Sequence, residues 1–371
     1  MKKGSAEGIG LRTWKLADYQ PGDEVAIVPL FERVFGKPMG ASESANHWRW
    51  EYLENPVQPL LIKLAWDGPR LVGQYAASPR RVRLDGRDVV AALSLDTMTD
   101  PEYHRLGIFA STAKALYTDQ ARLGQTFIYG FPNANSIYGI TKRLGWRRIM
   151  PTPVHVRPIT PTSFFARRLP SWLASLSARA ISFGANLTSA MAKRGSRADD
   201  LVLREEGGFG AWADDLWQRC RDQHRVWVIR DYSYLNWRYN RRPENDYCVV
   251  TAWSGQRAAG YVVMTLADRK WGRTCFVLDF LADITINGAV AALVDRVVTY
   301  AAKKGVDFAS ALLTPGCCYR SAFRRQLFLP LSERWFPKEL YFGARAFDPA
   351  VADVLLDRNA WSIGWGDEDV L

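Results

Sequence analysis

The sequence contains few residues that bind metals or form disulfides. Its 371 residues include four histidines and five cysteines, and two of the cysteines, Cys317 and Cys318, are adjacent. An odd number of cysteines without metal-like spacing argues against a disulfide framework or a structural zinc site. We therefore expect a reduced, cytoplasmic protein that binds no metal.

Long apolar runs are also missing. No stretch approaches the roughly 20 apolar residues that a membrane-spanning helix requires. The first residues, MKKGSAEGIGLRTW, include two lysines but no apolar segment of the kind found in a secretory signal. Hydrophobic residues make up 48% of the chain and charged residues 23%, as in globular proteins. This length favours two domains, each with its own core.

The basic residues are scattered, although the net charge is +11. Arginines occur in pairs, as at Arg80-Arg81 and Arg324-Arg325, but no basic run of about five to eight residues occurs. The sequence contains no zinc-finger or RNA-recognition motif. Nucleic acid is therefore not the expected partner, whereas an anionic nucleotide cofactor or an anionic surface would suit this charge.

The most informative stretch lies between Leu93 and Trp146. It predicts a strand, a basic loop around Gly107, a helix, a second strand and a second helix. Backbone N–H groups at the start of a helix, with the positive end of its dipole, form a site for phosphate oxygens. His104 and Arg105 would add side-chain donors, and Gly107 would let a ligand approach the backbone closely.

At these residues the chain resembles the GNAT acetyltransferase superfamily. That family binds the pyrophosphate of acetyl-CoA on a Gln/Arg-x-x-Gly-x-Gly/Ala loop after its fourth strand. The aligned loop here has Gly107 at the central glycine, His104 in place of Arg or Gln, and Phe109 in place of a small residue. A second block, from Asn133 through Leu144-Gly145-Trp146, is similar to the family's Asn-rich turn and closing Leu-Gly-aromatic signature.

The resemblance implies acetyl-CoA as the acyl donor and no metal. The end of the fourth strand would hold the pantetheine arm and the acyl carbonyl, the loop would hold the phosphates, and the Asn-rich turn would contact the arm. In that order, the expected cofactor-binding residues are Thr97, Met98 and Thr99; His104, Arg105, Leu106, Gly107, Ile108 and Phe109; and Asn133 and Asn135. An ordinary turn and helix cap would explain the two asparagines equally well.

Three residues are assigned to acid–base catalysis. The family's general-acid tyrosine lies four residues before the closing glycine, where this chain has Thr141, so the nearest tyrosine, Tyr138, is the candidate acid. Asp96, beside the donor strand, and Glu51, on a helix expected to line the acceptor cleft, are candidate bases. Because holding the two reactants together supplies much of the rate, a strong acid or base is not obligatory.

Turn residues predict two hairpins in the first half. Asp67-Gly68 and Asp85-Gly86 separate three apolar runs, and Asp-Gly between such runs is a strong hairpin signal. We therefore expect three antiparallel strands. The GNAT resemblance implies the rest of the topology, in which a helix at Gly107–Leu123 crosses over to a parallel strand at Phe127–Phe131.

The composition changes at 151–200. Five prolines are followed by a helical pattern, and Trp, Phe and Leu are mixed with Arg at 163–195. The pattern predicts a helical linker. Peripheral contact of 163–195 with an anionic membrane is the alternative.

The pattern of the first half begins again after 200. Trp237-Arg238-Tyr239 resembles Trp48-Arg49-Trp50, and Asp283–Gly288 takes the place of the phosphate loop but has no cation. We therefore expect an α+β fold with mixed sheets and two tandem GNAT-like domains: an acyl-CoA-binding domain at 1–150, the linker, and a degenerate domain at 201–371. The acidic C-terminal tail is expected to fray or to fold back onto an amine.

The predicted function is acyl-CoA-dependent N-acyl transfer, in the first place N-acetyl transfer to a small-molecule amine such as an amino-sugar. One alternative is aminoacyl transfer, as in the similar tandem folds that build peptidoglycan bridges. The CoA-like loop at His104–Phe109 argues against it, because that family does not require CoA. A non-catalytic protein that binds CoA or another ligand on the GNAT fold is the second alternative.

Overall fold

The computed structural model describes residues 13–36, 41–161, 201–243, 246–331 and 340–368. The helical stretch expected at 163–195, with its possible membrane contact, lies outside these residues. In the part of the chain that is described, no helix has the length and apolar character needed to cross a membrane.

The first half follows the predicted order of strands and helices. Its elements are β1 (Lys15–Asp18), α1 (Glu24–Phe35), α2 (Ala41–Trp48), the π-helical turn η1 (Arg49–Leu53), β2 (Leu61–Asp67), β3 (Arg70–Leu84), β4 (Arg87–Thr99), η2 (Pro101–Tyr103), α3 (Ile108–Arg122), β5 (Phe127–Gly130), α4 (Ala134–Arg143), β6 (Arg147–Pro151) and β7 (Val154–Pro158). Asp85 and Gly86 both have positive φ, as a two-residue hairpin requires.

The second half repeats much of this order. Its elements are β8 (Leu201–Glu206), α7 (Trp212–Cys220), β9 (Val226–Val228), α8 (Tyr232–Leu235), the π-helical turn η3 (Asn236–Asn240), β10 (Cys248–Ser254), β11 (Arg257–Arg269), β12 (Gly272–Ala282), α9 (Ala289–Lys303), β13 (Phe308–Leu312), α10 (Arg320–Arg325), β14 (Leu329–Pro330), β15 (Tyr341–Ala346), η5 (Pro349–Val351), α11 (Ala352–Leu356) and η6 (Trp365–Asp367). The series β2-β3-β4-α3-β5-α4 thus recurs as β10-β11-β12-α9-β13-α10.

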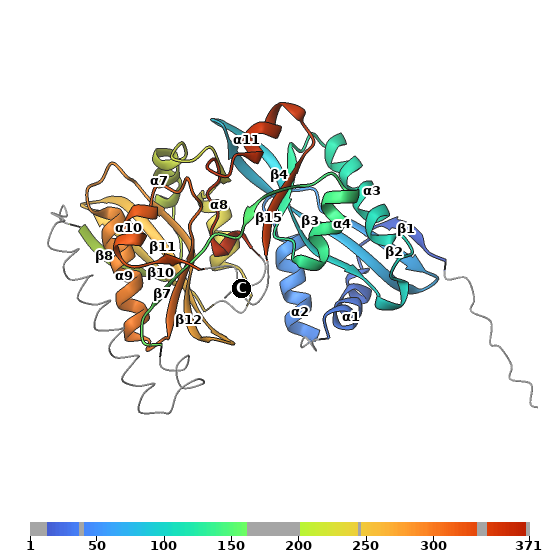
Figure 1. The fold of residues 1–371 in the computed structure, drawn as a ribbon, viewed down its shortest axis with the longest axis horizontal. Coiled ribbons are helices and arrows are strands. Elements are labelled where there is room, and N and C mark those ends of the chain that lie inside the picture. Colours follow the sequence, from blue (N-terminus) through green and yellow to red (C-terminus); the bar gives the residue numbers. More distant parts are fainter. Residues whose placement is uncertain (1–12, 37–40, 162–200, 244–245, 332–339, 369–371) are drawn as a thin grey trace, which may run out of the picture.

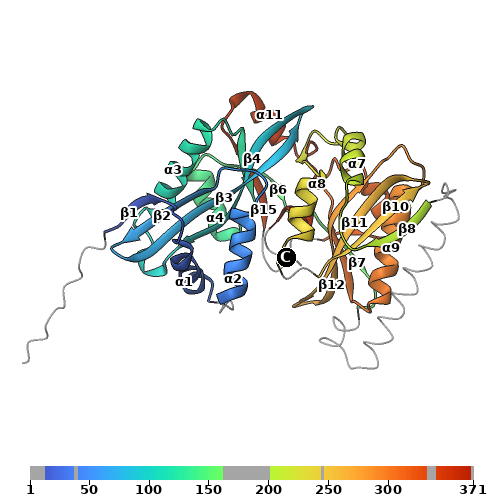
Figure 2. The ribbon, with the colours of Figure 1, turned by 180° about the vertical axis from the view of Figure 1, so that it is seen from behind.

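The strands form two mixed sheets that lie side by side (Figures 1 and 2). The first sheet has the order β1-β2-β3-β4-β5-β15-β6, with β9 paired to β3, and the second has the order β14-β7-β13-β12-β11-β10-β8. The expected α+β class with mixed sheets is confirmed. One buried cluster, with Trp50, Leu64, Trp237 and Phe276 among its members, contains side chains from both sheets.

Each sheet contains a strand from the other half of the sequence. β7 pairs antiparallel with β13 in the second sheet, and β15 lies between β5 and β6 in the first. In Figure 1, β15 is the red strand within the green and blue domain. The segment expected to be linker from residue 151 onward therefore begins with a strand of the second sheet, and the last part of the chain completes the first.

Two tryptophans join the halves about a local pseudo-twofold. The rings of Trp50 and Trp237 are stacked, with centroids 4.8 Å apart and planes at 13°. Each indole N–H donates to the other residue's backbone carbonyl, at 2.8 and 2.9 Å. The sequence analysis matched Trp237 with Trp48, which is wrong by two residues. The repeated units are Trp50-Glu51-Tyr52 and Trp237-Arg238-Tyr239, each in a π-helical turn.

The C-terminal segment is folded as far as residue 368. Trp361, Trp365 and Asp367 are buried. Asp367 accepts two hydrogen bonds from Arg230, at 2.6 and 2.8 Å, and Arg230 also pairs with Asp279 at 3.3 Å. The expectation of a frayed tail is wrong for these residues, because the segment buries its own rings of Trp361 and Trp365 and forms an ion pair with the buried Arg230.

Candidate functional site

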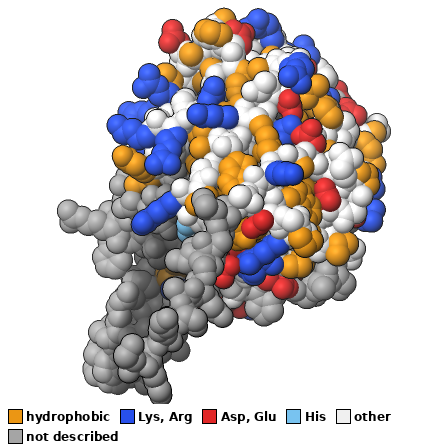
Figure 3. Space-filling view, turned by 90° about the vertical axis from the view of Figure 1, so that its right-hand side faces the viewer, with side chains coloured by type: hydrophobic (Ala, Val, Ile, Leu, Met, Phe, Trp, Pro, Cys, Tyr) orange, Lys and Arg blue, Asp and Glu red, His pale blue; other side chains and the backbone are white. Residues whose placement is uncertain are grey.

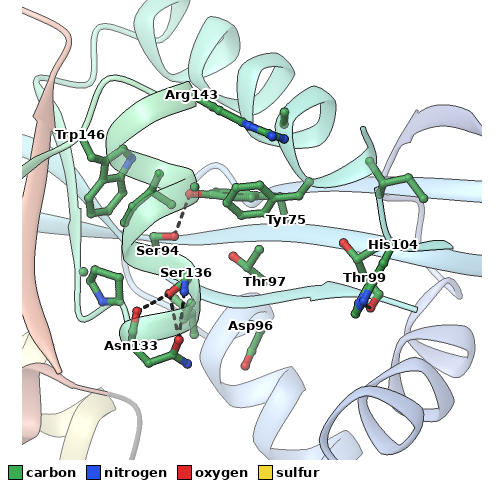
Figure 4. A pocket seen from close by; sticks show the side chains of 18 of the residues that line it. Tyr75, Ser94, Asp96, Thr97, Thr99, His104, Asn133, Ser136, Arg143 and Trp146 are labelled. Carbon is green, nitrogen blue, oxygen red and sulfur yellow. Dashed lines mark hydrogen bonds between the residues drawn. The ribbon is translucent and has the colours of Figure 1, made fainter. Parts of the chain in front are cut away.

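A cavity of about 630 Å³ opens where β4 and β5 separate (Figure 4). These parallel strands pair at Ala92–Ile128 and Leu93–Tyr129 and then diverge. The cavity is bounded by the end of β4, the loop after it, the start of α3, the turn at Asn133 and one face of α4. Its volume lies in the range of small-molecule sites, about 300–1,000 Å³.

The start of α3 forms one end of the cavity. Gly107 has φ of +82° and is the N-cap of α3, and Arg105 also has positive φ, at +68°. The first-turn N–H groups of a helix cannot bond within it and carry the positive end of its dipole. His104 Nε2 lies 3.2 Å from the carbonyl oxygen of Thr99, which ties the loop to the strand. This end is suited to phosphate oxygens.

A buried carboxylate holds this loop in place. Asp100 accepts from Arg33 at 3.0 Å, from Arg70 at 2.8 Å and from the N–H of Glu102 at 3.1 Å. Burial alone would raise the pKa of Asp100, but the hydrogen bonds from Arg70, Glu102 and Arg33 bring it below its usual value. Asp100 is therefore an ionised structural residue, and its partners fix where β4 ends and α3 begins.

Helix α4 contributes residues that the sequence analysis did not assign. Ser136 and Arg143 line the cavity with Asn133, and Asn133 Oδ1 accepts from the N–H of Ser136 at 3.1 Å. Arg143 adds a cation to the lining. The spacing of Asn133, Ser136, Ile140 and Arg143 places them on one helical face, which is the signal that could have identified Arg143.

Most of the predicted cofactor-binding residues meet at this cavity. Those that line it are Thr97, Thr99, His104, Arg105, Gly107, Ile108, Phe109 and Asn133. Met98 is buried in the core that contains Trp50, and Leu106 is partly exposed beside the loop, so these two could contribute through backbone groups. Asn135 lies in the first turn of α4. The binding roles of these residues remain predictions.

The three candidate catalytic residues lie in different environments. Asp96 lines the cavity at a strand irregularity, with φ of +45°. The hydroxyl of Tyr52 donates to the carboxylate of Asp96 at 2.8 Å. The side chain of Asp96 points away from Tyr75 and Ser94 (Figure 4). Tyr138 is 67% exposed on α4. Its role as the acid stays a prediction.

Glu51 is held in a buried ion pair. Its Oε1 accepts from Arg80 at 2.8 Å, and the two side chains are 8% and 5% exposed. Burial raises the pKa of Glu51. The charge and hydrogen bond of Arg80, with a hydrogen bond from Ser78, lower it by more than burial raises it, so the net shift is downward. A carboxylate that is ionised and paired is a weak base. The predicted role of Glu51 as the general base is untested.

A chain of buried hydrogen bonds ends in the cavity. Trp146 Nε1 donates to Tyr117 Oη at 2.8 Å, the hydroxyls of Tyr117 and Tyr75 are 2.7 Å apart, and Ser94 Oγ donates to Tyr75 Oη at 3.0 Å. Tyr75, Ser94 and Trp146 line the cavity (Figure 4). The sequence analysis gave none of these four residues a role in the site, because β3, β4, α3 and the turn after α4 meet only in the fold.

The comparisons with known proteins identify the first domain. Residues 16–149 match the family model of the acetyltransferase (GNAT) domain. The chain contains a GNAT acetyltransferase domain. The cavity lies within the matched residues except for Leu340. A comparison with curated proteins found no match.

Solved structures share the fold of nearly the whole chain. A GCN5-related N-acetyltransferase from Anabaena variabilis is similar with a TM-score of 0.61 at 12% identity, over 92% of this chain and 75% of that one. Another from Kribbella flavida gives 0.59 at 14% identity, over 92% and 73%. A structure from Pyrococcus horikoshii gives 0.54 at 11% identity, over 99% of both chains. The likeness therefore extends beyond the GNAT domain, and at these identities it concerns the fold.

The corresponding place in the second half is filled by the chain itself. β12 and β13 pair as far as Phe276–Ser310. Beyond this pair the C-terminal segment lies against both strands. Trp365 donates to Ser310 Oγ at 3.2 Å, and Gly364 is so close to β12 that a Cβ added to it would lie 2.6 Å from the carbonyl oxygen of Leu278. The cavity left there is about 30 Å³.

The loop of the second half keeps its shape but is occupied by a carboxylate. Gly288 is the N-cap of α9 with φ of +81°, as Gly107 is for α3. Asp283 is 2% exposed and accepts from Arg219 at 3.0 Å and Arg257 at 3.2 Å. The sequence analysis found no cation in this loop. Two arginines reach it from α7 and β11, and both pair with Asp283.

Figure 3 shows the GNAT-domain end of the molecule, where Lys and Arg side chains gather in one area and mix with Asp and Glu elsewhere. Within the described residues, no three His, Cys, Asp or Glu side chains form a group that could hold a metal ion.

Proposed function

We propose that the GNAT domain transfers an acyl group, in the first place acetyl, from acyl-CoA to an amine. The observation that supports this most directly is the cavity between β4 and β5, which joins the anion-binding start of α3 to unpaired strand edges. The first-turn N–H groups of α3 would hold the pyrophosphate, with charge supplied by Arg105 and Arg143. The edge of β4 at Thr97 and Thr99 would hold the pantetheine arm.

The two reactants would meet across β4. The cavity lies on the side of the sheet covered by α3 and α4, whereas Asp96 bonds to Tyr52, which follows α2 on the other side. An amine approaching from the α2 side would attack the thioester carbonyl carbon. The C–S bond would then break and leave thiolate, and the nitrogen would lose a proton to Asp96 or to water. An amino-sugar remains the acceptor to screen first.

We further propose that the chain binds one donor, in the first domain. The second half has the element order of a GNAT-like domain, but the C-terminal segment fills the space between β12 and β13, and Asp283 would repel a phosphate at the start of α9. Asp283 could not simply reorient, because Arg219 and Arg257 hold it. The second half would then serve the fold and the acceptor side.

Calorimetric titration with acetyl-CoA and with CoA tests this proposal, using Gly107→Glu and Gly124→Glu. Both glycines have positive φ and open space where a side chain would begin, so the backbone cost is similar. Gly124 lies past the end of α3, whereas Gly107 lies at its start. Gly107→Glu should abolish binding, because its carboxylate would enter the anion site. Gly124→Glu should bind as the wild type does.

If the wild type bound neither compound nor longer acyl-CoAs, the proposal would be wrong and aminoacyl transfer would become the leading alternative. A non-catalytic CoA-binding protein is favoured by the exposure of Tyr138 and by Thr141 at the usual position of the acid. Thiol release from acetyl-CoA across a panel of amines separates that case, since binding without turnover would support it.

A further inference from the structure

We propose that the amine acceptor also carries a carboxylate or phosphate group, and that Arg238 and Arg242 bind this group beside the ring of Trp50. The inference rests on the proposed function, because it concerns the second substrate of the same reaction. It specifies the charge of that substrate and places the site that recognises it at the junction of the two halves.

The two π-helical turns correspond residue by residue but carry opposite charges. The turn η1 with its continuation reads WEYLENP at 50–56, and η3 with its continuation reads WRYNRRP at 237–243. In each turn the residue two positions after the tryptophan is a tyrosine that donates to an aspartate, on β4 in the first half and on β12 in the second. Glu51 therefore corresponds to Arg238, and Asn55 corresponds to Arg242.

Only the acidic turn receives a counter-charge from the sheet beneath it. Glu51 accepts from Arg80 of β3 at 2.8 Å. Strands β3 and β11 follow matching hairpins, and counted from the first residue of each strand, Ala267 stands in β11 where Arg80 stands in β3. Ala267 packs against the apolar core. The reversal of charge at Arg238 is thus not accompanied by a carboxylate at the corresponding place in its own sheet.

Arg238 is a buried cation that bonds to backbone carbonyls. Its side chain belongs to a residue only 4% exposed. Nε donates to the carbonyl oxygen of Gly366 at 2.9 Å, and Nη2 donates to that of Glu368 at 3.3 Å. Nη1 has no hydrogen-bond acceptor in the described part of the chain. Because a buried charge without a counter-charge costs free energy, an anion that reached Nη1 would be bound favourably.

Arg242 brings a second guanidinium to the same aromatic ring. The Cζ atoms of Arg242 and Arg238 lie 5.3 and 5.5 Å from the centre of the Trp50 ring. Burial lowers the pKa of Arg242, and the positive charge of Arg238 lowers it further. The two cations therefore lie close enough to repel each other. An oxyanion between them would remove this repulsion and accept charge-assisted hydrogen bonds from both.

His47 lies on the other side of this group of cations as a neutral donor. Its ring centre is 5.1 Å from that of Trp50. Burial, followed by the charge of Arg242, lowers the pKa of His47 to about 4, although Glu51 opposes this shift and Arg238 adds to it. His47 and Arg242 are both partly exposed. A ligand can therefore approach them from solvent, and His47 can report its arrival.

These residues lie on the side from which the acceptor is proposed to approach. Helices α2 and α8, which lead into the two turns, meet at the junction of the halves (Figures 1 and 2). Tyr52, two residues after Trp50, donates to Asp96 at 2.8 Å, and Asp96 lines the donor cavity. The arginines would attract the anionic end of the acceptor and repel its amine, whereas Asp96 would attract the amine. The charges would thus orient the acceptor along η1.

The test follows the ring signals of His47 by NMR while the protein is titrated with ethanolamine, β-alanine and phosphoethanolamine. These small amines end in a neutral hydroxyl, a carboxylate and a phosphate, respectively. The chain has four histidines, and His47→Gln identifies the signals of His47. We expect β-alanine, phosphoethanolamine or both to shift these signals to saturation, whereas ethanolamine should not. The anionic amine that acts identifies the group as a carboxylate or a phosphate.

Arg242→Gln should weaken the binding of the anionic amines about tenfold, because it removes a charged donor. Arg241→Gln is the matched control, since Arg241 is the neighbouring arginine but pairs with Glu54 at 2.9 Å, and it should bind as the wild type does. No shift of His47 with either anionic amine would overturn the inference, as would equal affinities in wild type and Arg242→Gln or equal weakening by Arg241→Gln. The measurement needs no CoA, so a failure of the proposed function is detected separately, as absence of acetyl-CoA binding. Retained acetyl-CoA binding shows that each variant is folded.

Discussion

Burial keeps the side chain of His224 neutral in the folded protein at pH values where it would be protonated in the unfolded chain. Its side chain is 6% exposed, and burial, with a smaller contribution from Arg230, lowers its pKa from 6.5 to about 4. Between these values the unfolded chain binds a proton that the folded chain excludes. The contribution of neutral His224 to the unfolding free energy should therefore be fully present above pH 6.5. It should be lost as pH drops toward 4, by about 1.4 kcal/mol per pH unit.

Urea unfolding at several pH values between 6.5 and 5 measures this effect, and His224→Gln should reduce the slope of the unfolding free energy with pH by about that amount. Above pH 7 the variant and the wild type should differ by a constant. An unchanged slope below pH 6.5 would show that His224 is protonated in the folded protein.

Individual site residues were predictable where the signal is local. The loop from His104 to Phe109 could be placed at the start of a helix from local residues, and most of it lines the cavity. Its binding of phosphate stays a prediction. Arg143, Tyr75 and Ser94 could not be placed in this way, since they come from α4, β3 and β4 and meet only through strand register. Glu51 was assigned from its expected position on a helix, but the sequence does not show that Arg80, on β3, lies within 2.8 Å.

The turns η1 and η3 act as a pair at the scale of elements. Trp50 and Trp237 each donate an indole N–H to the other's carbonyl in a fully buried contact. Trp50→Phe keeps an aromatic ring but leaves the carbonyl of Trp237 without this donor. It should cost about 1–3 kcal/mol of unfolding free energy. Trp237→Phe should cost a similar amount.

Denaturant unfolding of both single variants and the double variant checks this pair. The double variant should lose less than the sum of the two, because the residues share one contact. Trp253→Phe is a control in which an indole N–H donates to Thr251 of the same strand, and it should cost less. Strictly additive losses at Trp50 and Trp237 would contradict a coupled pair.

Helices and strands were also predictable only where the signal is local. Asp85-Gly86 predicted its hairpin because two adjacent residues with positive φ determine the turn. No local feature of Tyr341–Ala346 shows that it pairs with β5 and β6, far away in the sequence. β7 was placed in a linker because prolines surround it, although its backbone pairs with β13.

The whole molecule depends on its C-terminal segment, because β15 belongs to the first sheet, between β5 and β6. Removal of residues 340–371 deletes β15 and the segment that covers β12. We expect the shortened chain to lose cooperative thermal unfolding and acetyl-CoA binding, even though it retains all of residues 16–149, because β5 and β6 would have no strand between them. Adding residues 340–371 as a separate peptide should restore both. Acetyl-CoA binding by the shortened chain as tight as that of the full chain would refute this dependence.

The place of β15 in the chain also affects how the protein is made. Synthesis proceeds from the N-terminus, and domains commonly fold as they leave the ribosome. Here the sheet around the cavity must wait for β15, which is translated after nearly all of the second half. A polypeptide released before β15 would carry all of residues 16–149 without a finished sheet around the cavity. Any ligand that needs this cavity would thus be bound only by chains translated past β15.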